Sequence, residues 1–429
     1  MARTLTPKDG RTLMVELYKL AIGKGITVLN TSDFVSAGET VLRSGMENVY
    51  NSLNMLCCNM VIAGRAYTQQ VKLMQTSDNL YNSRFRKISY YSKLPKNAGN
   101  FNTDLFTNFA TGFTAGQNID NGSAQSTKSQ WEQSLAIPLE MNFAGSTVWQ
   151  DCSTEIEDAV KQAFRNEAEL IAFVRGYLQE HQNDIVQNIE NFNRMARLNK
   201  VASVYAMSDK MPYSVVNLTT NFNAYYGTTY TSEELRSPAH FKEFLAFFVS
   251  EFKYHSDKLT RRTLNYHWSP AKQDETGEDI YILRHTSYDN QRVYLYGDLF
   301  RRAESLVLPE IFHDDELRIE NYEKVDFWQS EKTGEEMKID VIPAITDEST
   351  GLQVAGDRVT LDYVVGMITD RDGLMTNVQL ERSDTTALEA RKHFRNTWNS
   401  FARNVISDNT ENCVIFIMKD AEPEPEPET

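Results

Sequence analysis

The longest amphipathic pattern of the chain starts at Thr154. Apolar residues recur at intervals of three, four and seven from Ile156 to Ala196, which places them on one stripe of a helix of roughly ten turns. Thr154 and Glu157 have the spacing of a capping box. Since the heptads of a coiled coil are not sustained, the pattern predicts a long helix over residues 154–200 that lies across a sheet.

A second helical pattern follows Ser237 and Pro238, which suit the cap and the first helical position. Its apolar face is rich in phenylalanine, and we expect that face to be buried. The positions that form it are Phe241, Phe244, Phe248, Phe252 and Leu259.

Strand-like patterns lie on both sides of the long helix. Alternation at 85–94 and 135–143 predicts two paired strands, and short runs at 280–284, 292–296, 361–369 and 412–418 predict further strands. The aromatic-rich stretch 388–401 is interpreted as a helix or turn, and acidic helix or turn signals lie at 304–315. The polar stretch 332–357 predicts an exposed insertion. Glycine-interrupted helical patterns over 1–75 predict an N-terminal arm.

The segment from Pro95 to Lys128 joins the first two predicted strands. It is rich in Asn, Thr, Gly and Phe without a persistent period, and long loops of this kind are usually functional or disordered. Its four phenylalanines are costly to leave in water, which favours burial against a neighbouring chain. These candidate inter-subunit contacts are Phe101, Phe106, Phe109 and Phe113.

Composition places the chain among folded proteins with no general affinity for nucleic acid. Of 429 residues, 41% are hydrophobic and 11% aromatic, enough for a sizeable core. A net charge of -15 disfavours broad binding to phosphate backbones. The four cysteines, Cys57, Cys58, Cys152 and Cys413, fit no zinc-ligand spacing and are interpreted as reduced thiols. The polar start and the lack of a long apolar run predict a protein made in a cytoplasm, with no membrane partner.

Motifs that carry chemistry are missing from the sequence. It has no phosphate-binding glycine loop, no nucleophile elbow and no zinc-binding histidine pair on a helix. The cluster 313–315, His-Asp-Asp, could hold a divalent ion but is more typical of a solvated acidic turn. Asp370 and Asp372 resemble the start of a calcium loop, yet Leu374 and Met375 stand where a ligand and the turn glycine belong. We therefore expect no catalytic, cofactor or metal site.

Two paired basic positions complete the set of candidate residues. Arg261-Arg262 and Arg301-Arg302 lie on segments with folded patterns. Ordinary surface charge is one interpretation, and salt bridging to an acidic neighbouring subunit is the other. Arg261 and Arg262 are therefore candidate inter-subunit contacts.

The order of predicted elements has a specific counterpart. An arm, a two-stranded loop, one very long helix, a second helix, mixed strands and a returning C-terminal strand resemble the HK97-like fold of major capsid proteins of tailed bacteriophages. The local segments DKLTRRTLNYHW, RVYLYGDLFRRAES and ARKHFRNTWNSFARNVISDNTENCVIFIM are similar to segments of capsid proteins of small short-tailed podoviruses. The chain shows neither a C-terminal immunoglobulin-like domain nor an assignable crosslinking pair.

The resemblance implies an α+β chain with an N-terminal arm (1–80), an extended loop (81–150) and a peripheral domain with a spine helix (151–270). An axial domain (271–375), return strands (376–420) and a disordered acidic tail (421–429) follow. The implied function is a self-assembling icosahedral shell around double-stranded DNA, built of pentamers and hexamers with portal and scaffolding partners. DNA contact would be weak and non-specific.

Two alternatives remain open from the sequence. One is another virion structural protein, such as a portal or tail protein, although the chain has one dominant helix and a long two-stranded loop. The other is a carbohydrate-active hydrolase, for which acidic pairs such as Glu278-Asp279 or Asp314-Asp315 would be candidates. A deep cleft lined by acids and aromatics would favour the hydrolase.

Overall fold

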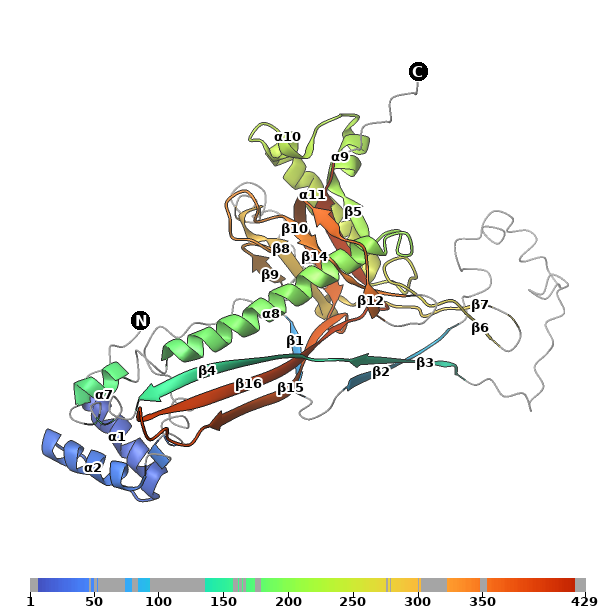
Figure 1. Cartoon of the computed structure of the whole chain (residues 1–429). Coiled ribbons are helices and arrows are strands. Elements are labelled where there is room, and N and C mark those ends of the chain that lie inside the picture. Colours follow the sequence, from blue (N-terminus) through green and yellow to red (C-terminus); the bar gives the residue numbers. More distant parts are fainter. Residues whose placement is uncertain are drawn as a thin grey trace, which may run out of the picture.

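The computed structural model combines helices and strands along the whole chain, which confirms the α+β class (Figure 1). It describes residues 7–45, 48–49, 52, 74–78, 84–92, 136–156, 161, 164, 167–173, 179–274, 277, 279–299, 301, 322–347 and 353–420. The predicted loop tip 95–128, the acidic signals at 304–315 and the tail 421–429 lie outside these residues.

A five-stranded mixed sheet forms the centre of the molecule. Its strand order is β5 (Val215–Asn217), β17 (Cys413–Met418), β14 (Tyr363–Asp370), β8 (Gln291–Tyr296) and β9 (Tyr322–Val325). β14 pairs antiparallel with both of its neighbours, whereas the two edge strands pair in parallel. The predicted strands at 292–296, 361–369 and 412–418 are confirmed.

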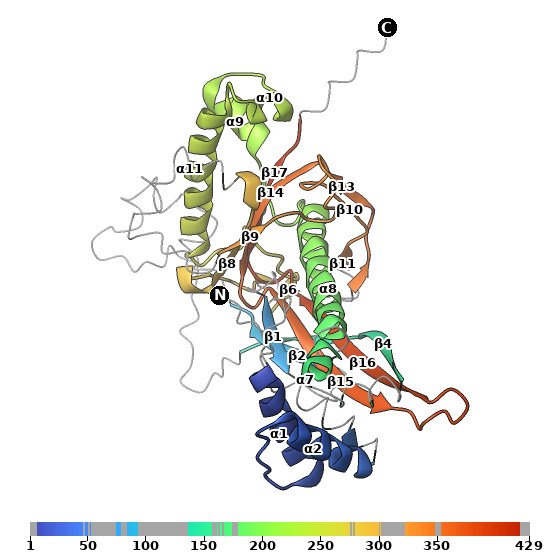
Figure 2. The same cartoon turned by 90° about the vertical axis from the view of Figure 1, so that its left-hand side faces the viewer.

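Helices cover both faces of this sheet. The helix α8 (Gln179–Ala206) packs on one face and α11 (Phe241–Leu259) on the other (Figure 2). Side chains of β17 alternate accordingly, because successive residues of a strand point to opposite faces. Val414, Phe416 and Met418 share a core with α11, while Ile415 and Ile417 share one with α8.

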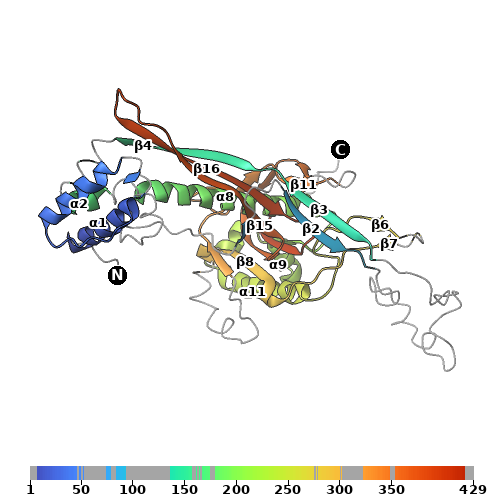
Figure 3. The ribbon, with the colours of Figure 1, turned by 90° about the horizontal axis from the view of Figure 1, so that it is seen from below.

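A second, four-stranded sheet extends away from the first. Its order is β1 (Gln75–Asp78), β15 (Leu374–Thr385), β16 (Phe394–Ser407) and β4 (Thr147–Ile156). β1 pairs only with 375–378, so β15, β16 and β4 continue beyond it as a three-stranded ribbon, seen from below in Figure 3. The predicted helix or turn at 388–401 is therefore wrong from Phe394 onward, where the chain is a strand that pairs with β4 and, from Thr397, also with β15.

The predicted pair of strands that holds the long loop is confirmed. β2 (Arg84–Tyr90) and β3 (Pro138–Ala144) pair antiparallel, with Phe85 opposite Phe143, and they project from the other end of the molecule (Figures 1 and 3). β3 is followed directly by β4 through Gly145, whose φ of 101° is readily adopted only by glycine.

The long helix has different ends from those predicted. α8 starts at Gln179 rather than Thr154 and continues to Ala206, and a short helix α7 (Glu167–Phe173) precedes it. Thr154 lies in β4, where its hydroxyl donates a 2.8 Å hydrogen bond to Asn396 Oδ1 on β16. The capping box is thus wrong, because ten residues of β4 pair along β16 instead.

The start of α11 is also corrected. Its N-cap is His240, without a side-chain capping bond. Ser237 ends the preceding helix α10 (Ser232–Arg236), donating its hydroxyl proton to the carbonyl oxygen of Glu234 at 2.6 Å. Another short helix, α9 (Leu218–Tyr226), lies beside α10. The predicted burial of the phenylalanine face is confirmed for all five positions.

Short elements complete the body. They are β6 (Lys272–Gln273), β7 (Asp279–Ile280), η3 (Tyr288–Asn290), β10 (Ile339–Val341), β11 (Ala344–Thr346), β12 (Gln353–Ala355) and β13 (Val359–Leu361). Of the strand predicted at 280–284, only residue 280 lies in a strand. The predicted exposed insertion at 332–357 is wrong in part, because β10 and β11 pack against α8 and Ile339 is fully buried.

The N-terminal helices form a small core of their own. α1 (Pro7–Ile22) and α2 (Thr31–Arg43) pack with α7 around Leu17 and Phe34. Arg11 Nε lies 3.0 Å from Glu167 Oε1, which ties α1 to α7. The helical pattern predicted for the start of the chain is confirmed over these two helices.

Candidate assembly surfaces

The ribbon of β15, β16 and β4 has two different faces. On the inner face Trp149 lies between Phe192 of α8 and Phe401 of β16, with ring centroids 5.6 and 5.5 Å away. On the outer face Val148, Ile156 and Trp398 are 60%, 54% and 40% exposed. The inner face therefore fixes the ribbon on the helix, and the outer face offers apolar surface to another molecule.

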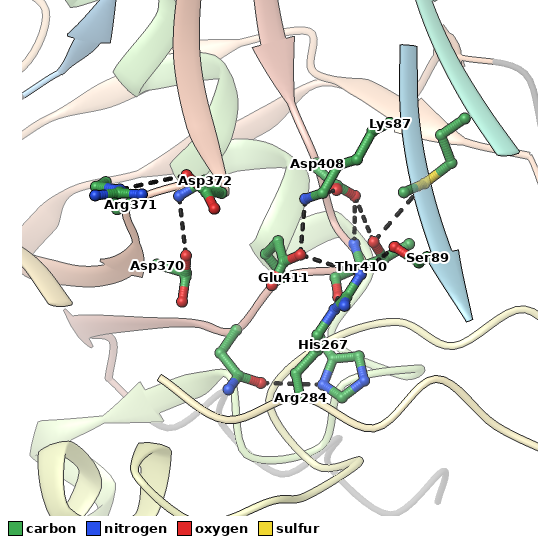
Figure 4. A network of polar contacts seen from close by, with 12 residues as sticks. Lys87, Ser89, His267, Arg284, Asp370, Arg371, Asp372, Asp408, Thr410 and Glu411 are labelled. Atoms are coloured by element: carbon green, nitrogen blue, oxygen red, sulfur yellow. Dashed lines mark hydrogen bonds and ion pairs between the residues drawn. The ribbon is translucent and has the colours of Figure 1, made fainter. Parts of the chain in front are cut away.

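The projecting β2–β3 hairpin is fixed to the body by a buried ion cluster. Figure 4 shows Lys87 of β2 pointing toward the turn between β16 and β17. Its Nζ lies 2.6 Å from Asp408 Oδ2 and 2.7 Å from Glu411 Oε1. Charged groups this far from water are stable only when they are paired, so the pairing fixes the position of the hairpin.

Arg284 adds a second attachment beside the first (Figure 4). Its Nη2 donates a 2.6 Å hydrogen bond to Ser89 Oγ on β2 and lies 3.1 Å from Glu411 Oε1. Its Nε donates to the carbonyl oxygen of Thr410 at 3.0 Å. Two cations and two carboxylates thus join one strand to one turn.

The electrostatics of the cluster follow from burial and pairing. Burial opposes the ammonium form of Lys87, but the carboxylates of Asp408 and Glu411 outweigh it and raise the pKa of that lysine. Burial likewise opposes ionised Asp408, yet Lys87 and hydrogen bonds from Thr410 hold the pKa of the carboxyl below its usual value. For Glu411 burial dominates and raises the pKa.

The turn at 408–412 also connects to α8 and to the core. Lys200 of α8 is fully buried and donates from Nζ to the carbonyl oxygen of Asp408 at 2.7 Å and to Asn409 Oδ1 at 3.1 Å. Burial lowers the pKa of Lys200. His267 Nδ1 lies 3.0 Å from Asn412 Oδ1 (Figure 4), and burial lowers the pKa of that histidine to about 4. The hairpin, the long helix and the sheet therefore meet at one buried polar turn.

The outer face of the hairpin carries a mixture of charge and apolar surface. Ile88 and Tyr90 of β2 are exposed, and Tyr90 lies opposite Pro138 of β3. Arg86 Nη2 forms a 2.7 Å ion pair with Glu140 Oε2 in the same face. Since side chains on one face of an antiparallel pair lie close together, this face is a continuous surface.

The residues proposed from sequence have different outcomes. Phe101, Phe106, Phe109 and Phe113 lie outside the described residues. Arg261 and Arg262 are exposed just after α11, and Arg262 Nη2 donates a 2.8 Å hydrogen bond to Ser92 Oγ within the same chain. Their role between subunits stays a prediction. The cluster 313–315 also lies outside the described residues.

Sequence reasoning missed the buried cluster around Lys87. Its partners are 321 and 324 residues away along the chain, beyond any local pattern. One signal was present, since the run Asp408–Asn412 is polar and directly precedes an entirely apolar strand. A polar run at that place needs buried partners or exposure to water.

Among the described residues, no group of three or more His, Cys, Asp or Glu side chains could hold a metal ion. A groove of about 600 Å³ lies between α8, β16 and the turn after β3, lined among others by Met195, Ile342 and Val405. No carboxylate or histidine lines it, unlike a glycoside-hydrolase cleft. Within the part of the chain that the structure describes, no helix is long and apolar enough to cross a bilayer.

No family model matches the chain, and no curated protein matches it. Solved structures with similarity over most of both chains come from phages. The capsid structure of Staphylococcus phage Andhra matches with a TM-score of 0.46 at 8% identity, covering 82% of this chain and 85% of that one. The structure of head fiber and inner core protein of bacteriophage P68 matches with a TM-score of 0.47 at 8% identity, covering 84% of this chain and 87% of that one. The capsid structure of cyanophage P-SCSP1u matches with a TM-score of 0.39 at 7% identity, covering 85% of this chain and 91% of that one. At these values the similarity assigns no function by itself.

Proposed function

We propose that the chain is the major capsid protein of a tailed bacteriophage and assembles into an icosahedral shell around double-stranded DNA. The observation that carries the proposal is the way two strand assemblies leave the central core in opposite directions (Figure 3). Both the ribbon and the β2–β3 hairpin expose apolar side chains, among them Trp398 and Tyr90. Thin elements with exposed apolar faces suit a subunit that tiles with copies of itself.

We divide the chain into capsid domains by which elements share a hydrophobic core. The five-stranded sheet with α11 would be the axial domain and the ribbon with most of α8 the peripheral domain. The resemblance implied a peripheral domain over 151–270, which includes α11; since α11 shares its core with β8, β14 and β17, it would instead belong with the axial domain. The hairpin with its connection would be the extended loop, and α1 and α2 the arm.

The partners and the location follow from the same role. Copies would form pentamers and hexamers, with portal and scaffolding proteins completing the head in the host bacterial cytoplasm. With a net charge of -15, the chain would contact packaged DNA weakly and without specificity. The chain would act as a virion structural protein and not as an enzyme, and it would need no cofactor.

Negative-stain electron microscopy tests the proposal. The purified chain is imaged alone and after co-expression with candidate scaffolding proteins, and closed shells, sheets or tubes are expected. A persistent compact monomer under both conditions would contradict the proposal and lead to a hydrolase activity screen.

A deletion tests the role of the loop. Removing residues 97–127 should leave a folded protein, measured by far-UV circular dichroism, that no longer forms closed particles. A second variant keeps the length of 97–127 and replaces only its four phenylalanines by serine; it should also lose closed particles if these side chains make the contact. If the deleted protein forms normal particles, the loop does not bridge subunits.

A further inference from the structure

We infer that β4 pairs with β4 of a second copy of this chain, antiparallel about a twofold axis that passes through Cys152. The sheet β1-β15-β16-β4 would then continue across the two copies. The inference deepens the proposed function, on which it rests, by naming the strand, register and symmetry of one contact between copies. Such a contact is isologous, because each copy contributes the same surface.

The outer edge of β4 is available for pairing. β4 is the last strand of its sheet, and among the described residues no strand pairs with its other edge. The strand is ten residues long, TVWQDCSTEI, and has no lysine, proline or bulge to protect its edge; its two charged residues, Asp151 and Glu155, alternate with the outward row. A long regular edge of this kind is a template for another strand.

Geometry restricts the possible registers. A twofold axis normal to a sheet leaves each face on its own side, so an outward residue of one copy can face only an outward residue of the other. The outward residues of β4 are all exposed: Val148, Gln150, Cys152, Thr154 and Ile156. Each allowed register therefore places one residue of β4 on the axis.

The axis at Cys152 matches the outward side chains. Val148 then faces the second copy's Ile156, and Gln150 faces the second copy's Thr154. Within this outward row, apolar groups meet apolar groups and polar groups meet polar groups. This register also pairs residues 148–156 completely, an overlap that among the allowed registers only an axis at Asp151 equals.

Neighbouring registers lack this match. An axis at Asp151 places two like charges directly opposite each other, which is destabilising. An axis at Ser153 places Gln150 opposite the second copy's Ile156 and leaves Val148 without a β4 partner. Charge and polarity therefore both select the axis at Cys152.

The adjacent strand extends the same apolar surface. Trp398 of β16 lies directly opposite Cys152 and is exposed. Across the axis the row would run from Trp398 through the two Cys152 side chains to the second copy's Trp398. Four exposed groups of low polarity thus come together at the centre of the contact, where burial contributes most.

Cys152 is a native reporter of this register because it is exposed and free. Cys57 and Cys58 are replaced by serine, and assembled protein is treated with copper phenanthroline and run on a non-reducing gel. Directly opposed cysteines in antiparallel strands have Cα separations compatible with a disulfide. We expect Cys152 to yield covalent dimers, which Cys152→Ser abolishes.

Moved cysteines test the register itself. In the Cys152→Ser background, Gln150→Cys alone and Thr154→Cys alone should form about tenfold less dimer than a mixture of the two, since only the mixture brings opposed thiols together. Tyr225→Cys, at an exposed position on α9, measures random collision. Equal dimer from all these positions, or none from Cys152, overturns the inference.

A charge pair supplies a readout without cysteine chemistry. Val148→Lys should weaken association in sedimentation velocity, because the new charge would be buried opposite Ile156. Adding Ile156→Glu to the same chain should restore association, since the new lysine and glutamate would then face each other across the axis. Both positions are exposed in the single chain, so folding should persist. Absence of this rescue contradicts the register.

The outcomes separate this inference from the proposed function. Shells without Cys152 dimers overturn the β4 contact but leave the capsid role standing. Dimers linked through Cys152 without any shell support the contact and contradict the capsid role. A chain that stays monomeric throughout contradicts both.

Discussion

The five-stranded sheet and the ribbon differ in how each covers its surfaces. In the sheet, every residue of β17 is buried because α8 and α11 cover both faces. In the ribbon, α8 covers one face of β4 and β16, and Trp398, Val148 and Ile156 are left exposed on the other. The first region has both of its faces covered within one chain, whereas the second leaves apolar surface exposed.

The largest expected effect lies in the covered sheet. Phe416 is fully buried, with the rings of Phe248 and Phe252 each 5.7 Å away. Phe416→Ala should lower the free energy of unfolding by about 3–5 kcal/mol, since it leaves a cavity beneath α11 that the surrounding side chains fill only in part. Urea denaturation measures the change. The matched change on the ribbon, Trp398→Ala, should alter the unfolding of the isolated chain little but reduce assembly.

A smaller loss is expected where the projecting hairpin joins the body. Lys87→Met removes the partner of two buried carboxylates and should cost about 3 kcal/mol. Hydrogen exchange should become faster over 84–90 and 138–144. Arg86→Met, one residue earlier in an exposed ion pair, is the control and should change neither quantity appreciably. Equal effects of both variants would contradict an anchoring role for Lys87.

The covered sheet should also lose stability in mild acid. Burial lowers the pKa values of His255 and His267 to about 4, below the ordinary value near 6.5. Between pH 6.5 and 4 the unfolded chain binds protons that the folded chain does not, so stability falls as pH falls. The loss should reach on the order of 2 kcal/mol per histidine by pH 5.

Thermal unfolding across that pH range measures the slope. The raised pKa of Glu411 acts in the opposite direction, so the comparison is made between variants. His267→Gln should reduce the slope, and His285→Gln, at an exposed position, should leave it unchanged. An unchanged slope in His267→Gln would show that this histidine does not control the acid response.

The smallest effect is expected at the C-terminus. Asp420 is the last residue that the structure describes, and its Oδ1 accepts 2.6 Å hydrogen bonds from both the backbone nitrogen and the hydroxyl of Ser232. Removing 421–429 should leave unfolding and particle yield unchanged within error. A severe assembly defect would assign the acidic tail a role between copies.

The two regions also differ in how well the sequence predicted them. The spacing of Phe241, Phe248 and Phe252 matches one helical face and predicts a buried helix. The apolar run 412–418 likewise predicts a buried strand. In the ribbon, Thr154 lies in β4, although its sequence spacing to Glu157 is that of a helix cap. The pattern of a half-exposed strand is weak, and only pairing with β16 decides between the two structures.

The buried ion pairs of Lys87, which hold the hairpin, could not be predicted from local sequence either. A lysine in an alternating strand is usually solvated, and nothing near Lys87 in sequence distinguishes it from Arg84 or Arg86. Its burial follows from the position of the turn at 408–411, which only the folded chain brings to it. Tertiary contacts of this kind are invisible to periodicity, while the order of strands and helices is not.

The passage from β3 to β4 through Gly145 and Ser146 has a mechanical consequence. The two strands run in one line from Pro138 to Ile156 (Figures 1 and 3), held first against β2 and then against β16. Their interstrand bonds lie perpendicular to the strands, so tension along this line loads many bonds in shear at the same time. A pull on the projecting hairpin along this line should therefore reach the far end of the subunit without breaking the interstrand hydrogen bonds one after another.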